Sequence, residues 1–180
     1  MNLDNQKFLI IIDMQNDFIT GPLGTSEARN IVDKVYTKIR EAKKSGTKII
    51  FTRDTHFTNY NKTLEGQNLP VSHCIIDTEG WQIIPELPTN SAKIFNKYTF
   101  GDRYLAEELA ECYNLSEENL IELCGVCTDI CVVSNALMLR AFLPNVPISV
   151  DASCCAGTTL EKHKAALEVM KSCQIEVINE

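Results

Sequence analysis

The sequence is short of positive charge. Its 17 lysines and arginines are outnumbered by 24 aspartates and glutamates, which leaves a formal net charge of −7. No cluster of basic residues interrupts this acidic balance. Nucleic acids and anionic membrane surfaces attract proteins through concentrated positive charge. The composition therefore argues against a nucleic acid or a membrane as the partner of this protein.

The sequence also lacks a long apolar run near its start. The run FLIII (8–12) ends at Asp13, which is too short for a signal peptide or a membrane-spanning helix. We therefore expect a cytoplasmic protein, whose thiols stay reduced. The long apolar segments can build a core without covalent cross-links. A disulfide framework is thus the weakest interpretation of the eight cysteines.

Short runs rich in Ile and Val recur along the chain. They are FLIII (8–12), KIIF (48–51), LIEL (120–123), PISV (147–150) and IEVI (175–178). Such runs are typical of strands buried on both faces of a parallel sheet, and AKIFNKYTF adds a short candidate ending near Lys97. Helical patterns lie between them at 26–46, with Ser26 as the expected N-cap, and at 103–112, 128–143 and 159–172. The alternation predicts a single α/β domain (1–180) with a doubly wound, Rossmann-like, mostly parallel sheet and helices on both faces.

Polar or reactive residues follow four of the expected strands. Asp13 follows the first, Asp54 the second, a cysteine-rich stretch follows LIEL, and Asp151 follows PISV. In open α/β sheets, ligands bind at the carboxyl ends of the strands. We therefore expect these residues to converge at one edge of the sheet.

The stretch LCGVCTDICVV (123–133) holds three cysteines. Cys124 closes a strand, Thr128 is expected to be the N-cap of a helix, and Cys131 falls in its first turn. The unpaired N–H groups and positive end of a helix lower the pKa of a thiol and can form an oxyanion hole, which favours Cys131 as a nucleophile. Two alternatives remain open: a metal or iron–sulfur site completed by the cysteines at 154–155, and small buried hydrophobic residues.

A nucleophilic cysteine usually relies on a histidine base. Of the three histidines, His56 and His73 lie in a long polar loop, and His163 lies between two lysines on an expected solvated helix face. Asp13 is the alternative base, because a carboxylate at the end of a buried strand has a raised pKa. Lys97 is the candidate cation that would hold the thiolate.

The loop after KIIF contains a second candidate site. Asp54 and His56 form an Asp-x-His pair at a strand end, where alternate residues point the same way. Glu65 and His73 could complete a set of nitrogen and oxygen ligands suited to zinc, iron or manganese. The alternative interpretation is a solvated loop.

Five blocks together resemble the isochorismatase-like cysteine hydrolase superfamily and, within it, the nicotinamidase/pyrazinamidase group. They are IIIDMQNDFITG (10–21), FTRDTHFTNYNKTLEGQNLPVSHC (51–74), NKYTFGDRYLAEEL (96–109), LCGVCTDICVVSNA (123–136) and VDASCCAGTT (150–159). The resemblance implies an isochorismatase-like hydrolase fold. It also implies that Cys131 is the nucleophile, Asp13 the general base and acid, and Lys97 the third catalytic residue. The backbone N–H groups of Cys127 and Cys131 would form the oxyanion hole, after a cis peptide bond between Val126 and Cys127.

The same resemblance implies a substrate pocket and a divalent metal ion. Phe18 and Val126 would line the pocket, and one zinc, iron or manganese ion would bind to Asp54, His56 and His73. Glu65 matches a fourth ligand that only part of the group has. In many nicotinamidases a tryptophan shortly precedes the histidine at the third metal position, here His73, whereas Leu69 stands in that neighbourhood in this sequence.

The implied activity is hydrolysis of a small aromatic carboxamide, first of all nicotinamide to nicotinate and ammonia through a thioester, as in NAD salvage. A cysteine hydrolase acting on another small amide or a carbamoyl or ureido compound is the nearest alternative. A non-catalytic thiol protein that binds metal or senses redox state is the alternative from another class. Relatives often form dimers or tetramers, so the resemblance is compatible with a homo-oligomer.

Overall fold

The computed structural model describes residues 7–112 and 120–180, so the outermost N-terminal boundary of the expected domain lies outside the described residues. These residues form a six-stranded sheet in the order β3-β2-β1-β4-β5-β6, in which every neighbouring pair is parallel. The strands are β1 (Lys7–Ile12), β2 (Lys48–Asp54), β3 (Lys93–Lys97), β4 (Leu120–Val126), β5 (Ile148–Ala156) and β6 (Glu176–Ile178). This is the doubly wound order, whose switch point lies between β1 and β4. The prediction of the fold is confirmed.

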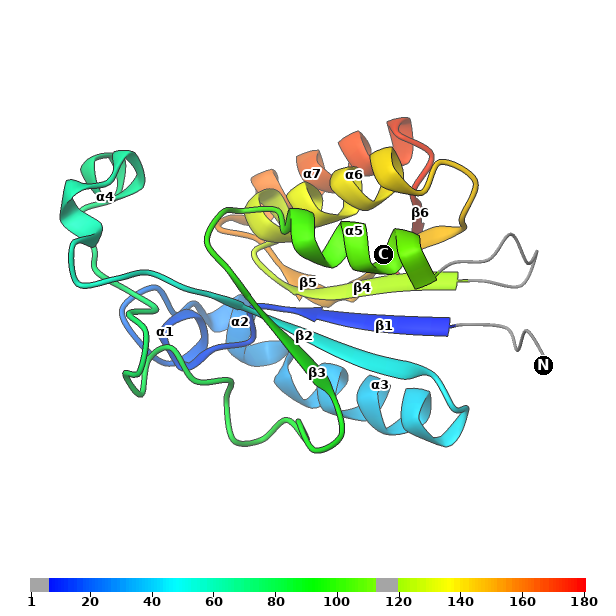
Figure 1. Cartoon of the computed structure of the whole chain (residues 1–180), viewed down its shortest axis with the longest axis horizontal. Helices are drawn as coiled ribbons and strands as arrows, with labels where there is room; N and C mark the ends of the chain where they lie inside the picture. The colour runs from blue at the N-terminus through cyan, green and yellow to red at the C-terminus, as the bar shows by residue number, and fades with distance from the viewer. Residues whose placement is uncertain (1–6, 113–119) are drawn as a thin grey trace.

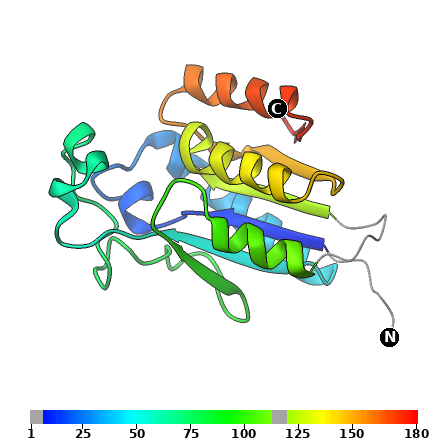
Figure 2. The same ribbon diagram turned by 45° about the horizontal axis from the view of Figure 1, so that its top comes forward.

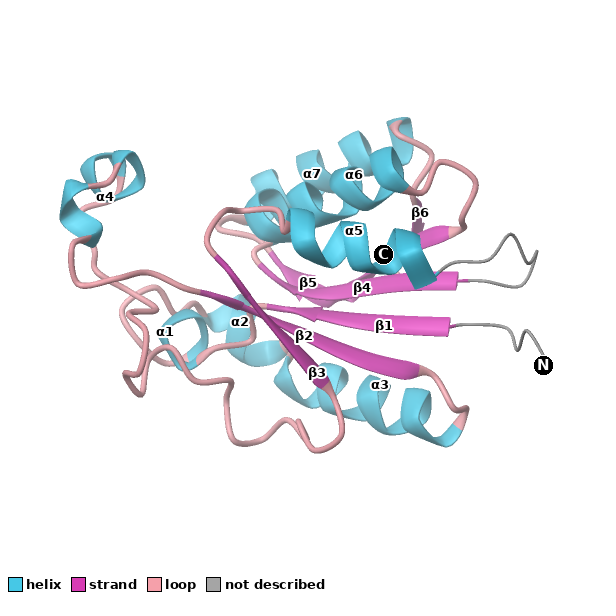
Figure 3. Cartoon of the chain, viewed as in Figure 1, coloured by secondary structure: helices cyan, strands magenta, loops and turns pink. Residues whose placement is uncertain are grey.

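Helices cover both faces of the sheet. On one face, α3 (Val32–Lys44) follows α1 (Asn16–Ile19) and α2 (Ser26–Asn30). On the other face, α5 (Arg103–Cys112), α6 (Val133–Phe142) and α7 (Leu160–Ser172) lie side by side, as Figures 1 and 2 show. The short helices η1 (Tyr60–Lys62) and α4 (Leu64–Asn68) project beyond the carboxyl edge of the sheet, within the long loops that Figure 3 colours pink. No helix in the described ranges has the length and apolar character needed to cross a membrane.

The central strands are apolar on both faces because each face is covered by helices. Ile10, Ile11 and Ile12 of β1 are wholly inaccessible to solvent, and so are Leu123 of β4 and Val150 of β5. These residues do not alternate with polar ones, as expected for a parallel sheet with two covered faces. The pattern in the sequence therefore identified the core strands correctly.

Two predicted helix starts were wrong. The first helix is capped by Thr25, whose hydroxyl accepts the N–H of Ala28 at 3.0 Å, whereas the hydroxyl of Ser26 donates to Glu27. The later helix is preceded by the one-turn π-helix η2 (Thr128–Val132), whose N-cap position is Cys127, so Thr128 lies inside the helix. In both places a neighbouring residue has the extended backbone that a cap position requires.

Asp151 does not lie at the carboxyl edge, contrary to expectation. Strand β5 continues to Ala156, and the register between β4 and β5 shifts after the pair Leu123 and Val150. Asp151 is therefore an internal residue of β5, where its Oδ2 lies 2.6 Å from Nζ of Lys38 on α3. Small residues after Asp151 allow the strand to continue, which a short Ile- and Val-rich pattern could not reveal.

Gly125 sets how closely β1 and β4 approach each other. It pairs with Ile12 and has a φ of +119°. A Cβ atom at this position would lie 2.1 Å from the carbonyl oxygen of Ile12, so no other residue fits without moving a strand. The residue after β1, Asp13, and the cysteine-rich segment after β4 are consequently brought together at the switch point of the sheet.

Candidate active site

A buried lysine joins three acidic groups at the carboxyl edge of the sheet. Lys97 is the last residue of β3, and its Nζ lies 2.8 Å from Asp13 Oδ2 and 2.8 Å from Asp54 Oδ1. The same Nζ donates to Cys131 Sγ at 3.3 Å. All four residues are at most 5% exposed. The structure therefore brings together the nucleophile, the base and the cation that the sequence predicts.

The position of each group follows from the strand that carries it. Asp54 and Lys97 are register partners at the ends of β2 and β3, so the long lysine side chain can reach past Asp54 towards β1. Asp13 follows β1 directly and adopts a positive φ of 49°. Cys131 comes from η2, which begins two residues after β4 ends. Three strand ends and one helical turn thus build a single centre.

Burial governs the proton affinities in this centre. It raises the pKa of Asp13 above its ordinary value, although the charge of Lys97 opposes the shift. It would lower the pKa of Lys97, but the charges of Asp13, Cys131 and Asp54 raise that pKa well above its ordinary value. These charges favour the protonated form of Lys97, and Asp13 binds a proton more readily than an ordinary carboxylate does, as the expected general base should.

The prediction that a helix end lowers the pKa of Cys131 was wrong for this environment. Burial raises the pKa of the Cys131 thiol well above its ordinary value, although Lys97 lowers it in part. Cys131 is 5% exposed, and Asp13 and Asp54 add negative charge nearby, which raises the pKa further. A thiol with a raised pKa needs a base to remove its proton before the sulfur can attack.

Two buried polar side chains that sequence reasoning missed hold Asp13 and Asp54 in place. Thr52 donates from its hydroxyl to Asp13 Oδ1 at 2.7 Å and accepts the N–H of Asp13 at 3.2 Å. The side-chain amide of Gln15 accepts the N–H of Asp54 at 2.7 Å and donates to the carbonyl of Asp54 at 2.9 Å. Both side chains are fully buried. A polar residue inside an apolar strand, such as the threonine in KIIFTRD, is the signal that could have found the first of them.

The three cysteines of the motif have different environments. Cys124 is buried in β4, Cys127 is partly exposed at the start of η2, and only Cys131 contacts Lys97. All eight cysteines are free. The group of possible metal ligands found among the described residues contains no cysteine. The alternative of a cysteine-bound metal or cluster therefore has no support in this part of the structure. The peptide bond between Val126 and Cys127 is cis, as expected.

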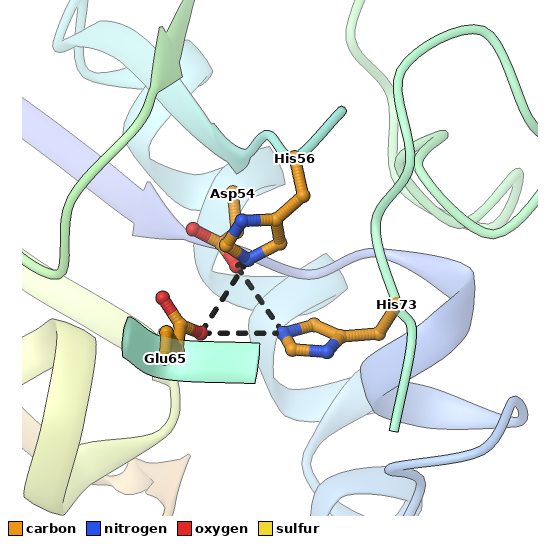
Figure 4. A group of neighbouring side chains, drawn as sticks. All are labelled: Asp54, His56, Glu65 and His73. Atoms are coloured by element: carbon orange, nitrogen blue, oxygen red, sulfur yellow. Dashed lines mark ion pairs between the residues drawn. The ribbon is translucent and has the colours of Figure 1, made fainter. Parts of the chain in front are cut away.

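A second cluster lies directly beside the first. Figure 4 shows the side chains of Asp54, His56, Glu65 and His73 pointing toward one another, with ligand atoms within 4.8 Å of each other. Nε2 of His56 lies 2.9 Å from Asp54 Oδ2 and 3.5 Å from Glu65 Oε1. Nε2 of His73 lies 3.6 and 3.7 Å from the same two oxygens. All four residues that the sequence analysis named therefore meet, including Glu65.

The donor set fits a divalent metal ion. Two imidazole nitrogens and two carboxylates are ligands that zinc, iron and manganese share. His73 Nδ1 lies 2.8 Å from the carbonyl of Val71, which leaves Nε2 directed at the cluster. His56 Nε2 is buried and has no partner among the described residues besides the carboxylates of Asp54 and Glu65. A buried nitrogen that faces only carboxylate oxygens is well placed to bind a metal ion.

Neighbouring residues hold the loop that carries the ligands. Tyr60 is buried and packs edge-on against His56 and His73, with ring centroids 4.7 and 5.0 Å away. The carboxylate of Asp17 accepts the N–H of Cys74 at 2.7 Å, directly after His73. Neither residue was singled out by sequence reasoning, because their contacts depend on a loop whose path a linear pattern does not show.

The expected pocket residues lie next to these clusters. The ring of Phe18 is 5.4 Å from that of His73, and Phe18 is partly exposed. Val126 is buried at the end of β4, directly before Cys127. His163 differs from expectation. It does not lie on a solvated face, because its Nδ1 lies 2.8 Å from the hydroxyl of Thr128. No histidine forms a hydrogen bond with Cys131 among the residues that the structure describes.

The fold and the buried thiol centre correspond to the class of hydrolase that the sequence motifs resemble. A profile of the family described as the Isochorismatase domain matches residues 7–180, and the chain belongs to this family. The nicotinamidase of Schizosaccharomyces pombe is 26% identical over 208 residues, which cover 96% of this chain and 92% of that protein. The prediction of a nicotinamidase-like hydrolase is confirmed at the level of the family.

Two solved structures are similar over almost their whole length. The pyrazinamidase of Pyrococcus horikoshii, in complex with zinc, is 28% identical with a TM-score of 0.82, covering 97% of this chain and 99% of that chain. The nicotinamidase/pyrazinamidase PncA of Bacillus subtilis is 25% identical with a TM-score of 0.82, covering 97% of this chain and all 100% of that chain. These similarities confirm the isochorismatase-like hydrolase fold.

Proposed function

We propose that this protein hydrolyses nicotinamide to nicotinate and ammonia, with Asp13, Lys97 and Cys131 as its catalytic residues. The observation that carries the proposal is the contact of Lys97 Nζ with all three acidic groups, Asp13, Asp54 and Cys131, in a fully buried centre. The similarity to nicotinamidases and pyrazinamidases supports the choice of an aromatic carboxamide as substrate. A role in cytoplasmic NAD salvage would follow from this activity, and a homo-oligomer is compatible with it.

The first half of the reaction forms a thioester. Asp13 accepts the thiol proton of Cys131 while the sulfur attacks the carbonyl carbon of the amide, and a tetrahedral oxyanion forms. The backbone N–H groups of Cys127 and Cys131 donate to this oxyanion, and each such donor contributes about 10²- to 10³-fold to the rate of comparable enzymes. Asp13 then gives the proton to the departing nitrogen, and ammonia leaves as the thioester forms.

The second half of the reaction releases the acid. A water molecule attacks the thioester while Asp13 accepts one of its protons, and the same two N–H groups hold the new oxyanion. Collapse of this intermediate expels the sulfur, which recovers its proton from Asp13, so the enzyme returns to its initial state. Lys97 keeps its positive charge throughout and stabilises whichever of Asp13 and Cys131 is anionic.

Asp54, His56, His73 and Glu65 would hold a divalent ion beside this centre. The ion would act as a Lewis acid towards the ring nitrogen of the substrate. It would orient the substrate and would not activate the nucleophile. Phe18 lies next to His73 and would pack against the aromatic ring. Asp54 belongs to both clusters, since its Oδ1 contacts Lys97 and its Oδ2 faces His56.

The test is ammonia release from a panel of amides by the zinc-loaded protein. We expect turnover of nicotinamide and pyrazinamide, and loss of turnover by roughly 10⁴-fold or more in Cys131→Ala with substrate binding retained. The matched control is Cys127→Ala, which keeps the backbone N–H and should stay active. Clear hydrolysis by Cys131→Ala would refute the nucleophile. Preference for a carbamoyl or ureido compound would refute nicotinamide as substrate, and the absence of any turnover would favour a non-catalytic thiol protein.

A further inference from the structure

The connection between β5 and α7 contacts the turn that carries the candidate nucleophile. His163 is partly buried in the first turn of α7, and its backbone N–H donates to the carbonyl of Thr159 at 2.9 Å. Its ring Nδ1 lies 2.8 Å from the hydroxyl of Thr128, the first residue of η2, which is fully buried. A helix held by its own backbone bonds therefore fixes a side chain of η2.

The next residue of η2 is held in the same way. One carboxylate oxygen of Asp129 accepts the N–H of Thr158 at 2.7 Å, and the other accepts the hydroxyl of Thr158 at 2.6 Å. Gly157 allows this close approach. A Cβ there would lie 2.8 Å from Cβ of His163 and 2.9 Å from an oxygen of Asp129. Two consecutive residues of η2 are thus attached to one short segment after β5.

These attachments lie between the two N–H groups of the proposed oxyanion hole. Thr128 follows Cys127 directly and precedes Cys131 by three residues. The carbonyl of Cys127 also accepts the N–H groups of Ile130 and Val132, each at 3.1 Å, so the turn is a compact unit. A shift of Thr128 would therefore change the relative position of both N–H groups.

We propose that His163, acting through the hydroxyl of Thr128, is a positioning residue for the oxyanion hole and for Cys131. The inference rests on the proposed function, which assigns the oxyanion to Cys127 and Cys131. His163 does not touch the reacting atoms and is not a base. The hydroxyl of Thr128 can donate or accept, so the bond exists with either tautomer of the imidazole. Preorganised donors lose much of their effect when they are displaced by a fraction of an ångström.

Two substitutions at one position test the role. His163→Leu removes the polar atom and keeps an apolar side chain, whereas His163→Asn places an amide near the position of Nδ1. We expect His163→Leu to lower kcat about tenfold with little change in KM, since ground-state binding does not use the oxyanion hole. His163→Asn should recover most of kcat. Lys162→Leu, an exposed neighbour on the same helix, is the matched control and should keep kcat.

Thr128→Val shows whether the effect passes through the hydroxyl. This variant should match His163→Leu in kcat, and the double variant should be no slower than either single variant, because both remove the same bond. Melting temperature and metal content are measured for every variant. The inference is wrong if His163→Leu keeps kcat within about twofold of the wild type, if His163→Asn is as slow as His163→Leu, or if the two losses multiply in the double variant.

Alkylation of Cys131 separates this inference from the proposed function. The rate is measured with iodoacetamide by mass spectrometry of the peptide that contains Cys131. A loosened η2 should expose the sulfur, so alkylation should be faster in His163→Leu than in His163→Asn. If the wild type hydrolyses no amide, the proposed function fails while this difference still reports the attachment. Equal alkylation rates in the two variants would overturn the attachment itself.

Discussion

Lys38 and Lys97 each contact two carboxylates at the central sheet, and the two centres differ in how completely the oxygens are bonded. Lys38 contacts Glu122 and Asp151, and the second oxygen of Asp151 also accepts Asn179 at 3.1 Å. The other oxygen of Asp151 accepts the N–H and hydroxyl of Ser153 at 3.1 and 2.8 Å. Both oxygens are therefore fully used, as in a structural network.

In the centre of Lys97, one carboxylate oxygen of Asp13 has no hydrogen bond besides its ion pair with the lysine. Asp13 Oδ2 lies 2.8 Å from Nζ but accepts no hydrogen bond of good geometry, although it is buried. Thr52 donates to the other oxygen of Asp13, and the remaining groups around Lys97 Nζ are the thiol of Cys131 and Asp54, which belongs to the cluster of metal-ligand type. An incompletely bonded buried carboxylate has a cost that a purely structural role does not explain. The comparison supports the proposal that the Lys38 centre serves stability and the Lys97 centre serves catalysis.

The largest expected effect is a loss of kcat on substitution of Lys97 that substitution of Lys38 does not cause. Lys97→Met removes the charge that stabilises Asp13 and Cys131 as anions, so kcat should fall by about 10³-fold. Lys38→Met should leave kcat of the folded protein unchanged. Steady-state ammonia release measures both, with circular dichroism to establish that each variant is folded. Equal losses of kcat in the two variants would remove the distinction.

Lys38→Met should lower the stability of the protein, although it leaves kcat unchanged. Lys38→Met leaves Asp151, 1% exposed, without its cation, and should lower the free energy of unfolding by about 3 kcal/mol. Urea unfolding followed by tryptophan fluorescence measures the change. Lys171→Met, which removes a surface lysine paired with Glu168 and Glu180, is the matched control and should change stability by less than about 1 kcal/mol. A loss for Lys38→Met as small as that of the control would contradict a structural role.

Removal of a proposed metal ligand should lower metal content and substrate affinity, whereas a change at Lys38 should affect neither. His73→Ala should reduce the bound metal and raise KM by about 10- to 100-fold, because the substrate loses its orienting partner. Metal content by elemental analysis and KM are measured together. Lys38→Met serves here as the control that should keep its metal. Full metal content in His73→Ala would reject the ligand assignment.

The smallest effect concerns acid pH. Burial alone would raise the pKa of Asp151, but hydrogen bonds from Lys38 and Ser153 hold it below its ordinary value. A carboxylate with a lowered pKa in the folded state adds stability above the unfolded pKa, and this stability is lost as the pH falls through the folded pKa. The difference in unfolding free energy between the wild type and Asp151→Asn should therefore be constant near neutral pH and shrink below roughly pH 4. A difference that grows on acidification would show that the sign is wrong.

The sequence revealed the candidate catalytic residues because they stand at strand ends or in a short motif, whereas Glu65 and His73 in the long loop were assigned mainly through the family resemblance. Asp13 and Asp54 end apolar runs, and Lys97 ends a short strand, so a parallel sheet brings them to one edge. Asp151 was misplaced because β5 continues through small residues that do not resemble a strand core. Patterns along the chain can therefore locate reactive residues that stand at the end of a recognisable strand.

The supporting residues could not be predicted in this way. Gln15 and Thr52 bond across strands, and His163 bonds to Thr128 from a helix 35 positions away. His163 stands between two lysines in the sequence. In the helix, however, its ring faces η2, while Lys162 and Lys164 are exposed. Likewise, the pKa of Cys131 depends on burial, which a local motif does not specify. Contacts between distant segments decide these features.

Gly125 bears on how such proteins can change over generations. The spacing between the carboxylate after β1 and the sulfur after β4 depends on a position that offers no reactive atom at all. Any drift there to a bulkier amino acid would separate acid from thiol while every reactive group stayed intact. An inactive descendant could therefore retain a complete set of catalytic residues, and inheritance of those residues alone would not guarantee inheritance of the activity.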